Sequence, residues 1–449
     1  MKTIRILAYA LLLLVFFVIL HYFFPVSLSG TKAAIDNFFK FPLQNWWFIF
    51  PLLGIAIIFI LILYYGIHFL ASFGKGFRSK EENIKNISIM IASKDEMGLL
   101  ERTLDSIINC NYPLSKIQLI LITSGSTDGT TEYCQEFANK YEELETLVLA
   151  DQLEKKGKPP ALNYGLKYVK NEIIILYDSG CILEPDTLEK LIAPFNEMDA
   201  NAVIGPVLVE NWKENALTKG ILLDYTIVSG GGLLFEIKNR LGSSAYSFGR
   251  NFAVSTKFLK KYGGFNEDSM TEDLYLSVLL NLDNVPIIFS PEAKIYEYVP
   301  STWEILKKQR TRWIAGFTYD MPQLMAMKSE DKNGQSIIIS RNLTMMLIGN
   351  LDTWLPIVIA FSILYFLIGE YYLLTWNLIL VAFMLGFLVN AVRKYGDKHY
   401  SILLYFLISG YIHLFMFLAQ FSLPEEMSWE KTPMLFQREE EEVSALSTK

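Results

Sequence analysis

The chain has 449 residues, of which 52 % are hydrophobic, and its mean hydropathy is +0.28. This length exceeds that of a usual single domain, and the hydropathy indicates membrane segments around a globular part. The net charge of −7 argues against a nucleic-acid-binding protein, whose surface is usually basic, so we expect no nucleic-acid partner.

Two apolar segments come first in the chain. Ile6–Phe24 follows Lys2 and Arg5. A signal peptide begins in the same way, but no small-residue cleavage site follows, and we therefore expect a first membrane helix. Trp46–Leu70 contains no Asp, Glu, Lys or Arg and is long enough to cross a bilayer of about 30 Å. Residues 1–81 are thus predicted to form two transmembrane helices.

Residues 82–330 are predicted to form one α/β domain, because strand and helix patterns alternate along them. Patterns of buried strands cover residues 87–91, 118–122, 147–149 and 172–177. Such alternation predicts a mostly parallel central sheet, and ligands bind beyond the carboxyl ends of the strands in these sheets. Asp95, the turn 123–130 and Asp178 all follow predicted strands, so we expect them at one edge of the sheet. Asp128 in that turn is expected to cap a helix.

The stretch from Thr271 to Trp313 contains the strongest candidates for chemistry. Glu272 and Asp273 begin an apolar run that is predicted to be a helix. The helix dipole keeps a carboxylate at this position ionised, and the carboxylate can then take a proton from an attacking hydroxyl. Alternatively, these two carboxylates only cap the helix. Residues 289–295 alternate like a short strand.

The run Gln309-Arg310-Thr311-Arg312-Trp313 closes this stretch. Two arginines separated by one residue can hold a diphosphate, and the flat indole can stack on a sugar or base. Alternatively, the arginines only solvate a helix close to the membrane.

Three further spans are predicted within residues 331–424, together with an interfacial segment. They lie at about Leu343–Ile368, Leu373–Val392 and Ser401–Leu423. The basic link 393–398 is predicted to lie inside the cell by the positive-inside rule. The acidic tail 425–449 then lies outside, unless an interfacial segment among residues 335–355 reverses this topology. Asp352 is either a functional intramembrane carboxylate or a mark of the interfacial edge.

The basic residues Lys75, Arg78 and Lys80 follow the second span, so the α/β domain is predicted to be cytoplasmic. We therefore expect an integral, multi-pass cell-membrane protein with its catalytic domain on the cytoplasmic side.

The cysteines and histidines exclude two kinds of site. Cys110, Cys134 and Cys181 show no CxxC spacing, and we expect reduced thiols without a disulfide framework or a zinc site. All four histidines lie in or beside apolar segments, which excludes a Ser–His or Cys–His nucleophile in the polar middle of the chain. Carboxylates and arginines must therefore carry the chemistry.

Six short motifs occur in a fixed order along this chain. They are Ile89–Glu96, Gly125–Thr130, Gly157–Asn163, Asp178–Gly180, Thr271–Asp273 and Gln309–Trp313. Together they resemble the motifs of membrane-integrated family 2 glycosyltransferases with a GT-A domain. That group includes cellulose, chitin and hyaluronan synthases and the ceramide glucosyltransferases. The resemblance implies an α/β GT-A (Rossmann-like) domain with transmembrane helices on both sides.

The resemblance also implies a role for each matching residue. Asp178 would bind Mg²⁺ or Mn²⁺ on the donor's diphosphate, and Asp273, next to Glu272, would act as the base of an inverting transfer. The donor-binding residues would be Ser93, Asp95, Glu96, Ser124, Lys158, Asp178 and Ser179. The residues around the diphosphate and the acceptor would be Gln309, Arg310, Arg312 and Trp313.

Two departures from the family pattern bear on the substrate. Thr123-Ser124 stand where the family usually has paired acids, and Gly180 replaces the second acid of the DxD motif. The resulting Asp-Ser-Gly form resembles ceramide glucosyltransferases and favours transfer to a lipid.

We therefore expect a membrane-embedded inverting glycosyltransferase that passes a sugar from a nucleotide-sugar, a UDP-sugar in particular, to a lipid-linked acceptor among membrane lipids. The alternatives are a processive polysaccharide synthase with a glycan acceptor and a non-catalytic membrane protein that binds a nucleotide-sugar.

Overall fold

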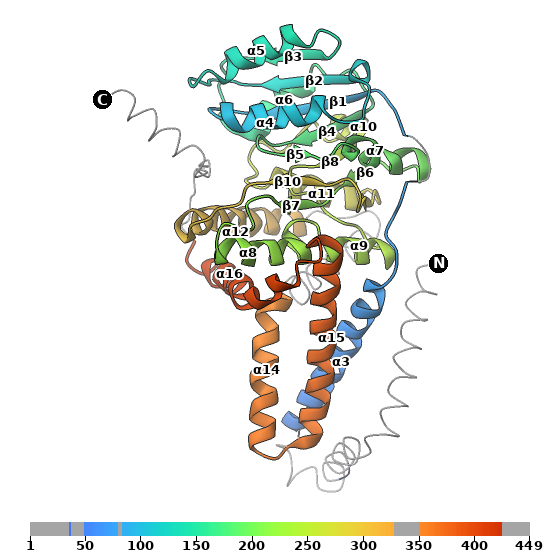
Figure 1. The fold of residues 1–449 in the computed structure, drawn as a ribbon, viewed down its shortest axis with the longest axis vertical. Helices are drawn as coiled ribbons and strands as arrows, with labels where there is room; N and C mark the ends of the chain where they lie inside the picture. The colour runs from blue at the N-terminus through green and yellow to red at the C-terminus, as the bar shows by residue number, and fades with distance from the viewer. Residues whose placement is uncertain (1–35, 37–48, 80–82, 327–349, 424–449) are drawn as a thin grey trace, which may run out of the picture.

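The computed structural model of the chain describes residues 36, 49–79, 83–326 and 350–423. An α/β domain occupies one end of an elongated molecule, and long helices extend from its base (Figure 1). The predicted first membrane helix over residues 6–24 and the acidic tail lie outside the described residues.

In the described part of the chain, the central sheet is seven-stranded, with the order β3-β2-β1-β4-β8-β6-β9. Its strands are β1 (Ile87–Ala92), β2 (Ile117–Ile122), β3 (Glu145–Leu149), β4 (Ile173–Tyr177), β6 (Ala202–Ile204), β8 (Phe252–Ser255) and β9 (Ile287–Phe289). The pairs β1–β2, β1–β4, β2–β3 and β6–β9 are parallel, whereas β8 runs antiparallel to β4 and β6. The prediction of a mostly parallel central sheet is confirmed.

Helices cover the sheet because each of them has an apolar side. In α4 (Met97–Ile108), Leu100, Leu104 and Ile107 recur at helical spacing and are buried. The other helices of this part are α5 (Thr130–Lys140), α6 (Lys158–Leu166), α7 (Thr187–Glu197), α10 (Thr256–Lys261) and α11 (Glu272–Leu282). Asp128 accepts hydrogen bonds from the N–H groups of Thr130 (3.0 Å) and Met97 (3.2 Å), which confirms its predicted capping role.

A small second sheet has the order β5-β10-β7. Its strands are β5 (Ile182–Leu183), β7 (Val207–Val209) and β10 (Ile295–Glu297). The prediction of one strand over residues 289–295 is therefore wrong, because β9 ends at the start of this stretch and β10 begins at its end. Pro291 in its middle cannot donate to a ladder, and the N–H of Ala293 turns back to the carbonyl of Ser290 at 3.2 Å.

The base of the domain is helical. It consists of α8 (Ala216–Asp224), η3 (Tyr225–Ser229), α9 (Leu233–Arg240) and α12 (Trp303–Ala326). Below it, α3 (Ile49–Ser72), α14 (Leu351–Leu367) and α15 (Tyr371–Tyr395) run along the long axis of the molecule, while α16 (Phe406–Ala419), after η5 (Tyr400–Tyr405), lies crosswise beneath α8 (Figure 1).

Three helical stretches of the described chain are long and apolar enough to cross a membrane: Ala216–Arg240, Tyr371–Tyr395 and Tyr400–Ala419. The first is buried inside the protein, whereas the other two expose much of their apolar surface. The apolar stretches Ala56–Ser72 and Leu351–Leu367 are shorter. The number of spans and the direction in which they cross the membrane stay predictions.

The long helices are joined to the domain by buried polar contacts. Lys394 at the end of α15 donates to the carbonyl of Gly74 (2.8 Å) and pairs with Glu236 of α9 (2.6 Å). Tyr395 donates to the same carboxylate (2.7 Å). The basic link after α15 and the segment after α3 therefore both lie against the α/β domain.

One buried side chain joins the two sheets and yields a test of the fold. Asn251 is fully buried in a left-handed backbone conformation (φ 49°) and donates to the carbonyls of Pro206 (3.1 Å) and Ala293 (2.7 Å). Replacement by alanine removes both hydrogen bonds. Pro206 still accepts from the N–H of Ile295 (3.1 Å), whereas the carbonyl of Ala293 loses this donor, so we expect Asn251→Ala to lower the free energy of unfolding by about 1–3 kcal/mol. All three cysteines are buried, and a thiol-reactive dye followed during heating therefore reports unfolding.

Asn284→Ala is the matched control, because Asn284 has a similar φ (58°) but is exposed. This variant carries the same backbone strain without losing the two buried hydrogen bonds. Equal melting temperatures for the two variants would contradict the role given to Asn251.

Candidate active site

A single cavity of about 960 Å³ extends from the carboxyl ends of β1, β2 and β4 to α12 and α16. Every residue that the sequence analysis selected lines it: Ser93, Asp95, Glu96, Ser124, Lys158, Asp178, Ser179, Glu272, Asp273, Gln309, Arg310, Arg312 and Trp313. Segments more than 200 positions apart in the chain thus contribute to one space.

The sheet end of the cavity is polar and is held by short loops. Asp95 accepts a hydrogen bond from the N–H of Thr127 (2.7 Å), which fixes the loop after β1 against the loop after β2. Ser124 accepts from the N–H of Leu153 (3.1 Å). Ser179 Oγ is buried and has no hydrogen-bond partner among the described residues, so it is left for a ligand.

Lys158 contacts two of the carboxylates of the site. Its Nζ lies 2.5 Å from Asp178 Oδ1 and 3.6 Å from Glu272 Oε1, and it donates to the carbonyl of Gly249 at 3.2 Å. Burial opposes the charge on this lysine, but the two carboxylates outweigh burial and raise the pKa of Lys158 above its usual range. The ammonium group thus joins the end of β4 to the start of α11.

Asp273 lies in the first turn of α11, as predicted. Burial, and then the charge of Glu272, raise the pKa of Asp273 to about 7, although Lys158 opposes this shift. Its Oδ1 accepts a hydrogen bond from the N–H of Leu274 at 2.8 Å. A carboxyl group with a pKa near neutrality is suited to take up a proton at physiological pH.

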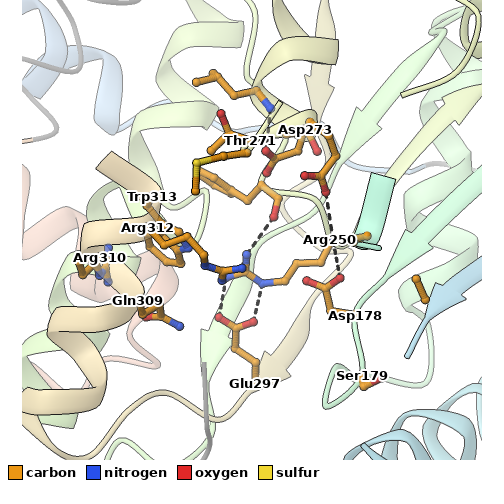
Figure 2. Close-up of a pocket in the computed structure, with 18 of the residues that line it drawn as sticks. Asp178, Ser179, Arg250, Thr271, Asp273, Glu297, Gln309, Arg310, Arg312 and Trp313 are labelled. Atoms are coloured by element: carbon orange, nitrogen blue, oxygen red, sulfur yellow. Dashed lines mark hydrogen bonds and ion pairs between the residues drawn. The ribbon is translucent and has the colours of Figure 1, made fainter. Parts of the chain in front are cut away.

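Helix α12 supplies the opposite wall. Asp178 approaches from the end of β4 and Asp273 from the start of α11. Gln309, Arg312 and Trp313 approach from α12, and Arg250 lies between the two groups (Figure 2). Burial lowers the pKa of Arg312, and the carboxylates of Asp178, Glu272 and Asp273 only partly oppose it. Arg312 therefore faces a space that is lined by carboxylates, and a bound cation would offset their charge.

Arg310 has a different environment from the one predicted for it. Its side chain is 1 % exposed and pairs with the fully buried Asp224 of α8 at 2.9 Å. It also donates to Ser229 (3.2 Å), and its guanidinium lies 4.3 Å from the centre of the Trp313 ring. These contacts engage the guanidinium of Arg310 within the cavity wall, where it joins α12 to α8 and packs against Trp313.

The sequence analysis missed an ion pair in the middle of the cavity. Arg250 forms a two-point pair with Glu297 of β10, with one contact at 2.5 Å, and Tyr225 donates to the same carboxylate at 2.6 Å (Figure 2). Arg250 follows a glycine with φ of +76°, Gly249, which brings the backbone close to Lys158 and Asp273. A lone arginine after Phe-Gly and a lone glutamate after a short strand gave no signal strong enough to select them.

His413 was also missed, because its neighbours in sequence are apolar. The helix α16 brings it to the cavity wall, where Nε2 lies 3.0 Å from Asp224 and Nδ1 lies 2.7 Å from Asp352. Asp352 is buried and also accepts from Ser409. It therefore joins α14 to α16 through His413 and Ser409, and both interpretations of Asp352 stay predictions.

The part of the cavity between α12 and α16 is mostly apolar, although Asn350, His413 and Gln420 also line the cavity. It is lined by Ile314 and Phe317 of α12 and by Met416 and Phe417 of α16. Phe317 and Phe417 are also exposed on the outside of the protein. The cavity thus joins a polar end at the sheet to an apolar end at the crosswise helix.

The carboxylates of the site were tested for their fit to a metal ion. Among the residues that the structure describes, no group of three or more His, Cys, Asp or Glu side chains could hold one. Asp178 alone presents a partly exposed carboxylate at the predicted place. This set fits a hard cation that takes most of its ligands from a bound diphosphate and water, as Mg²⁺ commonly does.

Comparison with solved structures supports the fold. A mannosyltransferase from Pyrobaculum calidifontis, solved in complex with GDP-Man and Mn²⁺, aligns with a TM-score of 0.51 and 18 % sequence identity. The alignment covers 77 % of this chain and 97 % of that one. At this identity the likeness shows the fold alone, which is GT-A.

Two characterised relatives are similar to this chain in sequence. A beta-monoglucosyldiacylglycerol synthase of Nostoc sp. is 29 % identical over 233 residues, which are 51 % of this chain and 48 % of that protein. A poly-beta-1,6-N-acetyl-D-glucosamine synthase of Staphylococcus epidermidis is 28 % identical over 241 residues, which are 53 % of this chain and 56 % of that protein. The alignments therefore span about half the length of these relatives.

The family described as "Glycosyltransferase like family 2" matches residues 85–316, just over half of the chain. This range contains all thirteen selected residues of the cavity, from Ser93 to Trp313. The chain belongs to glycosyltransferase family 2.

Proposed function

We propose that the chain is a membrane-embedded, inverting glycosyltransferase that transfers a sugar from a nucleotide-sugar, a UDP-sugar in particular, to a lipid-linked acceptor. The observation that supports this proposal most directly is the continuity of the cavity. One space joins a polar end, suited to a nucleotide diphosphate, to an apolar end, suited to a lipid chain. Asp273 lies in that space, where a donor and an acceptor would meet.

In this proposal Asp273 removes the proton from the acceptor hydroxyl as that hydroxyl attacks the sugar. A direct attack from the face opposite the leaving diphosphate inverts the anomeric centre. Lys158 and Arg312 hold the diphosphate from opposite walls, and the ring of Trp313 packs on the sugar or the acceptor. Ser93, Asp95, Glu96 and Ser124 hold the nucleoside at the strand ends.

Asp178 is the residue that we propose to hold a divalent cation, Mg²⁺ or Mn²⁺, together with the donor's diphosphate. When bound, such an ion neutralises charge that develops on the leaving diphosphate. Lys158 now pairs with Asp178, and in the loaded site it is free to turn to a phosphate oxygen.

A lipid acceptor is favoured over a growing glycan by the polar residues of the long helices. Asn377 of α15 donates to the carbonyl of Val358 in α14 at 2.7 Å, and Asn390 donates to Ser72 of α3 at 2.7 Å. These amides join neighbouring helices, whereas a translocating channel needs polar groups that face a pore. A processive polysaccharide synthase remains the second candidate, because the relative from Staphylococcus epidermidis is named for such an activity.

We further propose that the α/β domain is cytoplasmic and that α3, α14 and α15 lie in the membrane. The large exposed side chains of α14 are apolar, among them Phe361, Leu364 and Leu367. The basic residues Arg393 and Lys394 end α15 next to the domain, as the positive-inside rule requires for a cytoplasmic face.

A transfer assay tests the proposed function. Purified protein in detergent is incubated with a panel of UDP-sugars, Mn²⁺ and a native lipid extract, and the products are identified by mass spectrometry. A lipid that gains one sugar supports the proposal, and a ladder of polymer supports the second candidate. Donor hydrolysis or transfer would eliminate the non-catalytic alternative, and the absence of both would contradict the proposal.

The pKa of Asp273 predicts how the transfer rate depends on pH. The base acts in its ionised form, so the rate should rise between pH 6 and pH 8 with a midpoint of about 7. Asp273→Asn should lower kcat by about 10²–10⁴-fold. Glu272→Gln removes a negative charge that raises the pKa of Asp273, so its midpoint should move to lower pH. A midpoint that stays in place in Glu272→Gln would contradict this electrostatic coupling.

Arg312 is predicted to bind the donor's diphosphate. Arg312→Ala should weaken binding of UDP by about 10–100-fold, because a hydrogen-bonded charge contact typically contributes about 1.5–3 kcal/mol. Isothermal titration calorimetry measures this change. Lys308→Ala is the control, since it removes the same charge from an exposed position of α12 and should bind UDP like the parent. Equal losses in the two variants would indicate a general charge effect.

Asp178 is predicted to link donor binding to the metal. The parent protein should bind UDP more tightly in Mn²⁺ than in EDTA, and Asp178→Asn should lose most of this difference. Calorimetry in the two buffers gives the ratio without an activity measurement. If Mn²⁺ still tightens UDP binding to the same extent in Asp178→Asn, residues other than Asp178 hold the cation.

A further inference from the structure

The segment that carries the proposed base Asp273 contacts α12 through Thr271, a residue at a helix-capping position. Thr271 occupies the N-cap position of α11, but its side chain makes no capping hydrogen bond. A threonine at this position usually accepts a hydrogen bond from its own helix. Here Thr271 Oγ1 instead donates to Asp320 Oδ2 of α12 at 2.8 Å.

Asp320 holds a second hydroxyl of the same segment. Ser269 Oγ donates to the same oxygen, Oδ2, at 2.5 Å, and the N–H of Thr271 donates back to Ser269 Oγ at 3.1 Å. Asp320 is buried, and it forms no ion pair with any described residue. A buried carboxylate is costly unless hydrogen bonds compensate it, and at Asp320 the hydroxyls of Ser269 and Thr271 supply them. The carboxylate of Asp320 thus accepts hydrogen bonds from the hydroxyls of Ser269 and Thr271.

Gly316 brings α12 close enough for these contacts. It precedes Asp320 by four residues and therefore lies on the same side of the helix. A Cβ atom at this position would lie 2.3 Å from Thr271 Cγ2, so a side chain cannot be accommodated without displacing Thr271. Gly316 and Asp320 thus form one surface that fits the N-terminus of α11.

The same helix carries the groups of the opposite cavity wall. Arg312 and Trp313 lie one turn before Gly316 and two turns before Asp320, and Asp273 lies two residues after Thr271. The contact between α12 and Thr271 therefore sets the distance between Asp273 and the diphosphate-binding side chains. This link does not involve the central sheet.

We propose that Asp320 and Gly316 are positioning residues of the transfer reaction, which hold the base Asp273 in register with Arg312 and Trp313 through Thr271 and Ser269. This inference rests on the proposed function for its kinetic part, but the contact itself can be tested without any activity.

The first test compares Asp320→Ala with Asp320→Asn in the full chain. Both hydroxyls donate to a single oxygen, which the amide of asparagine can replace, so Asp320→Asn is the conservative variant. Hydrogen–deuterium exchange of the chain in lipid nanodiscs reports on the backbone of residues 269–275. We expect at least tenfold faster exchange there in Asp320→Ala, and exchange within about threefold of the parent in Asp320→Asn.

Kinetics and UDP binding then separate positioning from general stability. With the UDP-sugar and lipid pair found by the transfer assay, Asp320→Ala should lower kcat by about 10–100-fold, because small displacements of reacting groups have effects of this size. The KM for the UDP-sugar, and calorimetric binding of UDP with Mn²⁺, should stay within twofold of the parent. If the parent shows no transfer but the exchange results hold, the proposed function fails and the contact stands.

Three results would overturn the inference. Exchange at residues 269–275 could be unchanged in Asp320→Ala, Asp320→Asn could behave like Asp320→Ala, or UDP binding and melting temperature could fall together with kcat. The last result would assign Asp320 a structural role only.

A double-variant cycle tests Gly316 independently. Gly316→Ala should accelerate exchange at residues 269–275, since its new methyl group meets Thr271 Cγ2. Thr271→Ser removes Cγ2 of residue 271 and keeps the hydroxyl that donates a hydrogen bond to Asp320. The Gly316→Ala/Thr271→Ser double variant should therefore exchange more slowly than Gly316→Ala alone. Additive effects of the two changes would show that the two residues do not meet.

Discussion

The arrangement of the site depends on the ion pair between Arg310 and Asp224. Both side chains are almost completely excluded from solvent, and they join α12 to α8 at 2.9 Å. Removal of one partner from such a pair typically costs about 3–5 kcal/mol, because the other charge remains buried. Asp224 is shared with His413, whose other ring nitrogen contacts Asp352, so α12, α8, α14 and α16 meet at one buried group of charges. The wall that carries Arg312 and Trp313 is thereby fixed relative to the helices below it.

The other wall is organised by charge rather than by packing. Asp178, Glu272 and Asp273 bring three carboxylates close together, and Lys158 alone contacts two of them. Burial, and then repulsion from Glu272, explain why the pKa of Asp273 rises to about 7. In the proposed function, a nucleotide diphosphate would add negative charge to this space, and a divalent cation at Asp178 and the guanidinium of Arg312 would offset it. We therefore expect the charges of the site to be balanced only when its ligand is bound.

Local sequence patterns predict the sheet and the residues at its edge, but they do not predict how distant elements pack against one another. The apolar runs that became β1, β2 and β4 predict a parallel sheet, and the residues after them gather at its edge because parallel strands end on the same side. Six motifs in order were sufficient to select thirteen residues that line the cavity. Glu297 and His413 were missed, and the pairing of Arg250 was not foreseen, because these contacts depend on how β8, β10 and α16 pack. Arg310 was expected at the diphosphate, but its partner Asp224 lies 86 positions away, and no periodicity indicates such a contact.

The most direct measurement of the central claim is the position of UDP and Mn²⁺ in the chain, determined by cryo-electron microscopy in lipid nanodiscs. The account predicts the diphosphate between Asp178 and Arg312, with Mn²⁺ on Asp178 and Asp273 facing the apolar end of the cavity. A nucleotide bound elsewhere, or a separation of α12 from α11 that leaves Arg312 outside the site, would contradict it.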